Sequence, residues 1–437
     1  MISMNNQSNK RSIPLDEFVG VVEPPEKKVN NCFKDNFEYI INNEKVDAEI
    51  NKRILEDGEL PDELEKTVTT KTNITEAKPN IVKEFKADFS RKRKVALLLA
   101  YCGANYSGMQ KNPDVETIEE KLLDALCEMK AIRAEHKHEF LVNNVNQISF
   151  QRAARTDKGV SAARQTVSLK LVASNTFLED VNKLLPDDIR VFGLERVTKS
   201  FNAKCCCSGR AYEYLVPSFA FAPSNDVFSP SYRISDEQFA KLNRLFSCYE
   251  GTHNFHNFTS GKPFSDQSAN RYIISFKANK PFECQGHEFI AIEISGQSFM
   301  IHQIRKMIGL VIAVCRGHCP EDTIEKSWLQ AKADIPKAPG LGLLLCKVFY
   351  NHYNEKHCND GLHKPITWSE QELEVERFKI EHIWYSIINE EIKKSPMVTW
   401  LKTLVNHTYT KVVMKSPMPS DYKGKNGVFP EIEKVNS

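Results

Sequence analysis

At 437 residues and a net charge of +2, the chain is long enough for two or three domains with a sizeable core. No apolar run approaches the roughly 18 residues of a membrane-spanning helix, and the first residues lack the apolar stretch of a signal peptide. Acids appear as early as Asp16 and Glu17, which weakens the case for a mitochondrial transit peptide. Twelve cysteines without a zinc-like spacing favour reduced thiols in the cytosol or nucleus.

The charge is divided unevenly along the chain. Residues 1–90 carry 13 basic and 18 acidic residues, a net charge of −5, whereas the remaining 46 basic and 39 acidic residues give +7. We interpret residues 1–90, which show no sustained periodicity, as a disordered acidic leader. The basic remainder is compatible with a nucleic-acid partner. The run RKRK at 91–94 is open to three interpretations: a solvated domain edge, a nuclear import signal or a contact with an RNA backbone.

Beyond residue 90 the chain alternates between strand and helix patterns. We expect strands over residues 95–103, 165–171, 189–197, 209–218, 271–279, 288–296 and 342–350. We expect helices over 114–132, where Asp114 is a candidate cap, and over 179–186, 235–251 and 298–317. Residues 252–259 are expected to form a loop. Cys205 to Cys207 are adjacent, and neighbours in a strand point to opposite faces, which suits neither chelation nor a disulfide.

These elements predict an α+β fold in which two related α/β lobes share a central, mainly antiparallel sheet. We place the N-terminal lobe at 91–230 and the C-terminal lobe at 231–355. Residues 356–437 form an accessory helical extension and a polar tail, with helical spacing of apolar residues over 367–394.

One carboxylate stands out in the segment ARTDKGVSA, residues 154–162. Asp157 is the only acid between Glu139 and Glu179, and basic residues surround it. An Asx turn or a helix cap is the commonest use of an aspartate near glycine. A nearby arginine would instead keep Asp157 ionised as a nucleophile or a charge stabiliser. Two-carboxylate glycosidase chemistry or a magnesium phosphatase would require a second acid, so a lone nucleophile fits better.

Two further constellations compete with Asp157 for the chemistry. Four histidines, at 253, 256, 302 and 318, suggest metal, but the first two lie in a loop with no close acid, so no metal site is predicted. Arg305 lies in the apolar helix pattern SFMIHQIRKMIG. It either pairs with a buried acid or lies exposed on the polar face of its helix, and the sequence leaves both open.

Taken together, these stretches resemble the tRNA pseudouridine synthase A family, in its eukaryotic multisite branch. Lys158, and Ser161 where bacterial relatives usually have histidine, indicate that branch, whereas the three adjacent cysteines are unlike most relatives. The resemblance covers residues 93 to about 350 through seven ordered segments: YCGANYSGMQKNP, ARTDKGVSA, LLPDDIRV, SFNAKCCCSGRAYEYLVP, GTHNFHNFT, SGQSFMIHQIRKMIG and APGLGLLL.

The resemblance implies roles for particular residues in a catalytic cleft between the two lobes. Asp157 would be the nucleophile that detaches uracil from its ribose, so that the base rotates and rejoins through C5; attack at C1′ and attack at C6 both remain open. Tyr212 would stack on the uracil and is a candidate base for its C5 proton, and Arg305 would pair with Asp157. The substrate-binding candidates are Arg155, which holds the target nucleotide out of the stack, Leu343, which floors the pocket, and Thr156, Lys158, Arg210 and His302.

The resemblance also implies the partners. The substrate would be tRNA, with messenger or small nuclear RNA as further candidates, and neither cofactor nor metal is needed because the reaction is an isomerisation. A monomer is slightly favoured, since bacterial relatives are dimers and an additional C-terminal helix in this chain could cover the surface that they use. The nucleus is the expected location, with cytoplasm and mitochondrion as alternatives. Two other functions stay open: an RNA-binding protein of the same fold without catalysis, and a metal-dependent phosphohydrolase using Asp157.

Overall fold

The structure is a computed structural model that describes residues 91–223, 229–409 and 411–412. These residues all belong to one compact unit, residues 57–437. The predicted acidic leader at 1–90 and residues 410 and 413–437 of the predicted polar tail lie outside the described residues. Within the described part of the chain, no helix is both long and apolar enough to cross a membrane.

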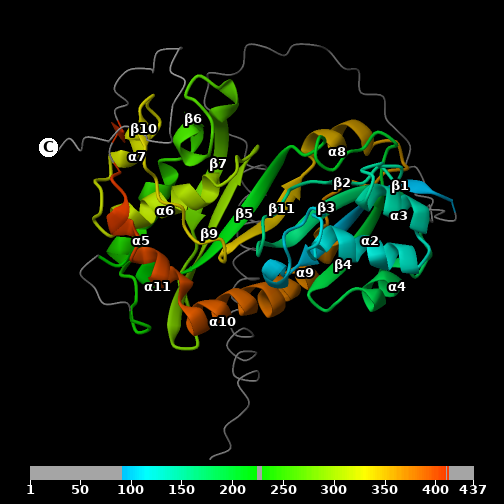
Figure 1. The fold of residues 1–437 in the computed structure, drawn as a ribbon, viewed down its shortest axis with the longest axis horizontal. Helices are drawn as coiled ribbons and strands as arrows, with labels where there is room; N and C mark the ends of the chain where they lie inside the picture. Colours follow the sequence, from blue (N-terminus) through cyan, green and yellow to red (C-terminus); the bar gives the residue numbers. More distant parts are fainter. Residues whose placement is uncertain (1–90, 224–228, 410, 413–437) are drawn as a thin grey trace, which may run out of the picture. The chain divides into compact units, whose positions relative to one another are not determined.

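One large mixed sheet runs through the unit (Figure 1). Its main path has the order β4-β1-β3-β11-β5-β9-β7-β6, with β2 paired to β3 and β8 paired to β9. All pairs are antiparallel except β11 with β3, which join the two halves of the sheet in parallel. The sheet strands are β1 (Arg93–Tyr101), β2 (Gln151–Arg152), β3 (Ser161–Leu171), β4 (Ile189–Arg196), β5 (Gly209–Pro217), β6 (Gly251–Asn254), β7 (Asn270–Ala278), β8 (Phe282–Cys284), β9 (His287–Gly296) and β11 (Leu343–Phe349). The predicted mainly antiparallel α+β fold is confirmed.

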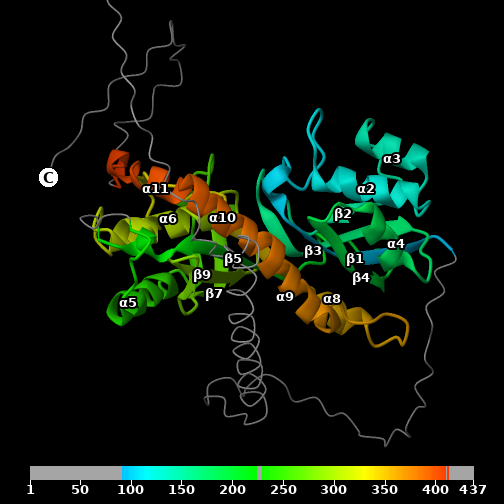
Figure 2. The ribbon, with the colours of Figure 1, turned by 90° about the horizontal axis from the view of Figure 1, so that it is seen from below.

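The helices are divided between the two halves of the sheet, except for one segment that spans both. The first half carries α2 (Ile118–Glu128), α3 (Ala134–Leu141), α4 (Phe177–Leu184) and α8 (Asn351–His357), and the second carries α5 (Asp236–Ser247), α6 (Gln303–Cys315), α7 (Thr323–Lys326) and α11 (Pro396–Leu401) (Figure 1). A continuous helical segment made of α9 (Glu372–Phe378), a π-helical turn (Lys379–Trp384) and α10 (Tyr385–Lys394) runs beneath both halves (Figure 2). A short pair, β10 (Lys332–Ala333) and β12 (Lys411–Val412), forms a separate ribbon.

The apolar pattern of the sequence explains which elements lie at the centre. The residues of β1 from Val95 to Tyr101 are fully buried, as expected for a strand covered on both faces. In the second half, Phe246, Phe255, Phe258 and Phe276 pack with the apolar face of α6 into a large core cluster. Ser235 begins α5 with a capping box, in which its hydroxyl accepts from the Gln238 backbone N–H.

Several helix starts differ from the sequence prediction because of local backbone geometry. Asp114 is not the cap of α2: it has a φ of 63°, and Thr117 caps the helix instead. The helix expected over 298–317 begins only at Gln303, since His302 has a left-handed φ of 65°. The helix expected over 367–394 begins at Glu372, and a π-helical turn interrupts it.

Three further predictions change in detail. The expected loop begins at residue 252, but residues 251–254 form the strand β6. They do so because they pair with β7, a strand whose first residue, Asn270, is distant in the sequence. Cys205 to Cys207 lie in a turn before β5 and not in a strand, since the Asn202 side-chain oxygen accepts from the backbone N–H groups of Lys204 and Cys205. In the basic run at 91–94, Lys94 is buried and donates to the Ser149 carbonyl at 2.7 Å, so only part of the run faces solvent.

Candidate active site

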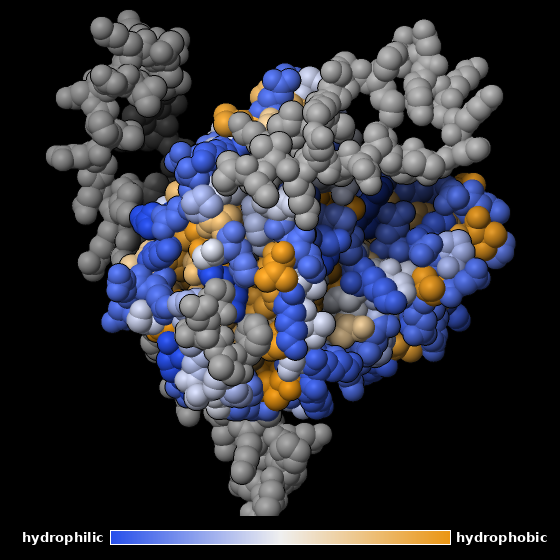
Figure 3. All heavy atoms as spheres, turned by 60° about the vertical axis from the view of Figure 1, so that its left-hand side comes forward, coloured by the Kyte–Doolittle hydropathy of each residue, from blue (hydrophilic) through white to orange (hydrophobic). Residues whose placement is uncertain are grey.

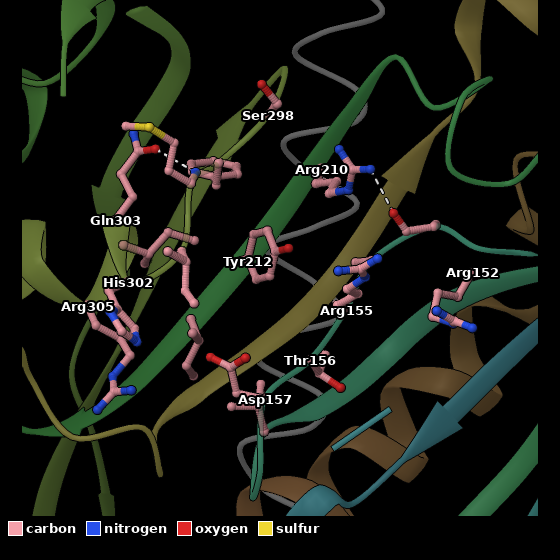
Figure 4. Close-up of a pocket in the computed structure, with 18 of the residues that line it drawn as sticks. Arg152, Arg155, Thr156, Asp157, Arg210, Tyr212, Ser298, His302, Gln303 and Arg305 are labelled. Atoms are coloured by element: carbon pink, nitrogen blue, oxygen red, sulfur yellow. Dashed lines mark hydrogen bonds between the residues drawn. The ribbon is translucent and has the colours of Figure 1, made fainter. Parts of the chain in front are cut away.

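A cleft of about 620 Å³ opens where the two halves of the sheet meet. Its walls come from the loop between β2 and β3, from the cleft-facing side of β5, from the first residue of β11, and from the segment joining β9 to α6 (Figure 4). The lining residues are Gln151, Arg152, Ala153, Ala154, Arg155, Thr156, Asp157, Val160, Lys204, Arg210, Tyr212, Ser298, Phe299, Met300, Ile301, His302, Gln303, Ile304, Arg305 and Leu343.

The backbone around Asp157 is fixed by close packing against the loop that follows β1. A Cβ on Gly103 would lie 2.2 Å from the Val160 carbonyl oxygen, and one on Gly108 would lie 2.8 Å from that of Thr156. These glycines therefore permit a backbone approach that any side chain would block. The Val160 N–H donates to the Asp157 carbonyl at 3.1 Å, and Gly159 supplies the positive φ of 77° that this turn requires.

This packing leaves the carboxylate of Asp157 exposed in the cleft. It forms no hydrogen bond or ion pair with any other residue that the structure describes, and it is the only acid among the described lining residues. Thr156 points the other way, and its buried hydroxyl lies 2.7 Å from that of Tyr101. The Thr156 hydroxyl therefore stabilises the turn, although Thr156 is also one of the residues that line the cleft.

Five basic residues line the same cleft: Arg152, Arg155, Lys204, Arg210 and Arg305. Arg155 is exposed, and Arg210 is held by donating to the Ala153 carbonyl at 2.7 Å. Lys158, predicted from the sequence to bind substrate, is exposed but does not line the cleft. The excess of cations makes the cleft suited to a polyanionic substrate.

Tyr212 lies between the two walls, with Arg155 on one side and His302 and Arg305 on the other (Figure 4). Its ring packs edge-to-face against Phe299, with the centroids 5.3 Å apart. Burial raises the pKa of Tyr212 to about 12, and nearby Asp157 adds to the shift, so the phenol is neutral near pH 7. The ring and Leu343 provide the apolar surfaces on which a planar base can lie.

The direct ion pair expected between Arg305 and Asp157 is not formed in this structure. Among the described residues, no salt bridge joins them, and Figure 4 shows the guanidinium set apart from the carboxylate. The Arg305 Nε–H instead donates to the Ala338 carbonyl at 2.7 Å, and a Cβ on Gly340 would lie 3.5 Å from the guanidinium carbon. Burial lowers the pKa of Arg305, while the negative charge of Asp157 acts in the opposite direction. The two groups therefore interact through space across the cleft.

His302 also lines the cleft but has no partners of a metal site. Burial lowers its pKa, helped by Lys337 and Arg305, so the imidazole is neutral near pH 7. Among the described residues, no cluster of three or more histidine, cysteine or acidic side chains could hold a metal ion. One carboxylate with no second acid also fits a magnesium phosphatase or a two-carboxylate glycosidase poorly.

Sequence reasoning missed part of the lining. Ser298, Phe299, Met300, Ile301 and Gln303 lie in the segment SGQSFMIHQIRKMIG, in which the sequence pattern marked only Arg305 and His302. In the sequence Arg152 is only a basic neighbour of Asp157, whereas in the structure it forms an ion pair with the buried Glu119. Lys204 lies beside the three cysteines and carries no signal in the sequence that would have placed it here.

Comparisons with known proteins show which family the chain is similar to. Residues 246–351 match the model of a family described as tRNA pseudouridine synthase. The pseudouridylate synthase 1 homolog of Homo sapiens is 46% identical over 342 residues, covering 76% of this chain and 79% of its own, and that of Mus musculus is 45% identical with shares of 77% and 80%. The tRNA pseudouridine synthase 1 of Yarrowia lipolytica is 34% identical, with shares of 69% and 72%.

The chain therefore belongs to the tRNA pseudouridine synthase family, and it is an isomerase. Within that family it falls in the eukaryotic branch of pseudouridine synthase 1, as the sequence motifs predicted.

Proposed function

We propose that this cleft binds tRNA and converts uridine to pseudouridine with Asp157 as the nucleophile. The observation that carries the proposal is the Asp157 carboxylate itself, which is exposed and unpaired among the described residues in a cleft lined by five cations. A carboxylate without partners is free to react, and the surrounding cations attract RNA phosphates.

The proposed reaction rearranges one nucleotide without a net change in atoms. The carboxylate of Asp157 attacks either C1′ of the ribose or C6 of the uracil, and the bond between N1 and C1′ breaks. The detached uracil rotates, and its C5 forms a new bond to C1′ as the aspartyl adduct is released. The proton on C5 leaves to a base and N1 gains one, so no oxidant, reductant or cofactor takes part.

The other lining residues fit supporting roles in this reaction. Tyr212 and Leu343 form an apolar bed for the uracil. Tyr212 is the proposed acceptor of the C5 proton; because its phenol is neutral near pH 7, it first gives its own proton to N1 of the detached uracil and then takes the C5 proton as the phenolate. Arg155 is exposed on the opposite wall from Arg305 and can contact the RNA backbone beside an extruded nucleotide. Arg305, held by Ala338, supplies positive charge toward Asp157 without neutralising it in a direct pair.

The experiment that tests the proposal uses unmodified tRNA transcripts and nucleoside analysis for pseudouridine. The wild-type protein should form pseudouridine, and Asp157→Asn should reduce turnover by at least about 1,000-fold while the Kd for tRNA stays within about threefold. Asp187→Asn is the matched control, because the Asp187 side chain is 95% exposed and does not line the cleft. Turnover by Asp157→Asn or Asp157→Ala close to that of the wild type would contradict the nucleophile assignment.

We also propose three broader properties of the protein: its further RNA substrates, its oligomeric state and its location in the cell. Messenger RNA and small nuclear RNA are further candidate substrates, since the cations of the cleft would contact phosphates, which all RNAs share. A monomer is favoured because the α9–α10 segment covers one face of the sheet (Figure 2). A nuclear location is proposed from the basic run at 91–94, of which Arg91 and Lys92 are exposed. Nucleoside analysis of each RNA class tests the substrates. Light scattering tests the oligomeric state, and a fluorescent fusion tests the location.

A further inference from the structure

Ile301 is a large apolar side chain held exposed in the cleft, which five cations also line. It is 57% exposed, although nearby residues in the chain turn inward: Met300 is 9% exposed and Gln303 is fully buried. On the face shown in Figure 3, exposed hydrophobic side chains form only small patches in a mainly hydrophilic surface. Within the part of the chain that the structure describes, more than half of the Ile301 side chain is therefore left uncovered.

The backbone fixes this exposure through a turn closed by two hydrogen bonds. The Gln303 N–H donates to the Met300 carbonyl at 3.1 Å, and the Met300 N–H donates to the Gln303 side-chain oxygen at 2.9 Å. His302 is the third residue of this turn and has φ 65° and ψ −3°, values that a type II turn requires and that glycine usually supplies. A histidine in this conformation is strained, and such strain persists where the surrounding structure enforces it.

A second anchor holds the segment from the other side. The Phe299 ring packs on Tyr212, and its tip would lie 3.0 Å from a Cβ placed on Gly296. Phe299, Met300 and Gln303 are thus locked in place, and Ile301 projects from a rigid support. A side chain presented in this way loses little conformational freedom when it meets a ligand.

We propose that Ile301 is an apolar wedge that occupies the gap left in the RNA stack when the target uridine is extruded. The inference rests on the proposed function, because it requires a nucleotide to leave the stack and reach Asp157. Extrusion leaves the neighbouring bases without a stacking partner, and inserted aliphatic side chains stabilise such unstacked steps. The free energy of burying an isoleucine is comparable to that of unstacking one nucleotide.

The position of Ile301 relative to the other lining residues supports this role. Asp157 and Arg155 lie on the wall formed by the first half of the sheet, whereas Ile301 belongs to the segment before α6 on the opposite wall, next to His302 (Figure 4). A uridine that reaches Asp157 leaves its two neighbours near the mouth of the cleft. Ile301 can then contact those neighbours while Arg155 holds the backbone.

The first test measures unstacking directly and does not depend on turnover. A tRNA transcript whose modified uridine has been mapped is rebuilt with 2-aminopurine beside that uridine, and the Asp157→Asn protein is added so that no product forms. We expect binding to raise the fluorescence of 2-aminopurine, and we expect the additional change Ile301→Ala to remove most of that rise at saturating protein. An undiminished rise with Ile301→Ala would overturn the proposal.

The second test compares substrates that differ only in stacking. On the folded tRNA, Ile301→Ala should lower kcat/KM by about tenfold or more relative to the wild type. On a short single-stranded RNA with the same sequence around the uridine, that loss should be smaller by a factor of at least about five. Ile301→Leu should restore most of the activity because it restores the apolar volume. Leu329→Ala is the matched control, since Leu329 is 51% exposed and does not line the cleft.

The remaining outcomes distinguish a wedge from a uracil contact and from a protein-binding residue. Equal losses on both RNAs would assign Ile301 to contact with the uracil itself, and unchanged kinetics on both would point to a protein partner; either result contradicts the wedge. An absence of pseudouridine with the wild-type protein would contradict the proposed function instead.

Discussion

Trp384 and Glu213 join the C-terminal helical segment to the strand that carries Tyr212: the indole Nε1–H donates to the Glu213 carboxylate at 2.5 Å. Because neighbouring residues of a strand point to opposite faces, Glu213 lies behind the sheet when Tyr212 faces the cleft. Lys379 lies beside the same carboxylate at 3.4 Å and also contacts Glu376 at 2.6 Å. Glu376 in turn forms an ion pair with Arg164 of β3 at 2.7 Å. The helical segment thus ties together the strand that follows Asp157 and the strand that holds Tyr212.

Removing Lys379 should be strongly destabilising, because the buried carboxylates of Glu213 and Glu376 would lose its positive charge. Burial raises the pKa of Glu213, whereas for Glu376 the opposing charges of Lys379 and Arg164 outweigh burial and hold the pKa at about 2. We expect Lys379→Met to lower the free energy of unfolding by about 3–5 kcal/mol in urea denaturation. Adding Glu213→Gln should recover part of that loss, since one uncompensated charge is then gone. Strictly additive losses in the double variant would show that the two residues are not coupled.

Glu391 should make stability fall as pH rises toward neutrality. Burial raises its pKa from 4.5 to about 7, while a hydrogen bond from the Met397 N–H opposes the shift. Between these values the folded protein holds a proton that the unfolded chain has lost, so the stabilisation is present below pH 4.5 and lost by about pH 7. Glu391→Gln keeps an acceptor for Met397 and should match the wild type near pH 5, yet be about 2–3 kcal/mol more stable at pH 8.

Urea denaturation at several pH values checks this effect. Glu390→Gln is the control, because Glu390 is more exposed and pairs with Lys394 at the surface. Its difference from the wild type should be small and nearly constant with pH. A Glu391→Gln difference that does not grow between pH 5 and 8 would mean that the carboxyl group is hydrated in the folded protein.

Tyr212→Phe separates stacking from proton transfer. The ring and its contact with Phe299 remain, so KM should change by less than about threefold, whereas kcat should fall by roughly 100-fold if the phenol oxygen accepts the C5 proton. Release of tritium from C5-labelled uridine in tRNA measures that step. His302→Asn is an informative comparison, since asparagine tolerates the positive φ at this position and the change removes the neutral imidazole, the alternative base of the cleft wall. Equal, mild effects of both changes would leave Tyr212 as a stacking surface only.

Arg305 should matter more for turnover than for binding. Arg305→Leu fits the apolar flank of α6 but removes the positive charge near Asp157 and the hydrogen bond to Ala338, so we expect kcat to fall by about 100-fold or more. Arg305→Lys keeps the charge but cannot donate to Ala338 and face the cleft at once, so its kcat should lie between those of the wild type and Leu. Single-turnover rates and tRNA binding, measured in parallel, check this. A loss confined to binding would make Arg305 a phosphate contact.

The sequence by itself determined the family and the fold class, and it singled out the one carboxylate that the described part of the cleft contains. The strand expected over residues 209–218 is formed as β5, because the alternation of side chains with a period of two is a local property of an extended chain. The isolation of Asp157 among basic residues could also be read directly, since it requires only neighbours in the sequence. These features depend on a few residues at a time, and the chain displays them in order.

Tertiary structure decided the features that depend on contacts far apart in the chain. Lys158 lies outside the cleft although Asp157 and Val160 line it, because the turn at Gly159 packs against the loop after β1. Arg305 is held by the carbonyl of Ala338, which no helix pattern could reveal, and the direct pair with Asp157 is absent. The charges that bind the C-terminal helix to the sheet come from residues more than 150 positions apart. Side chains find such partners only when the fold is complete, so no local pattern in the sequence encodes them.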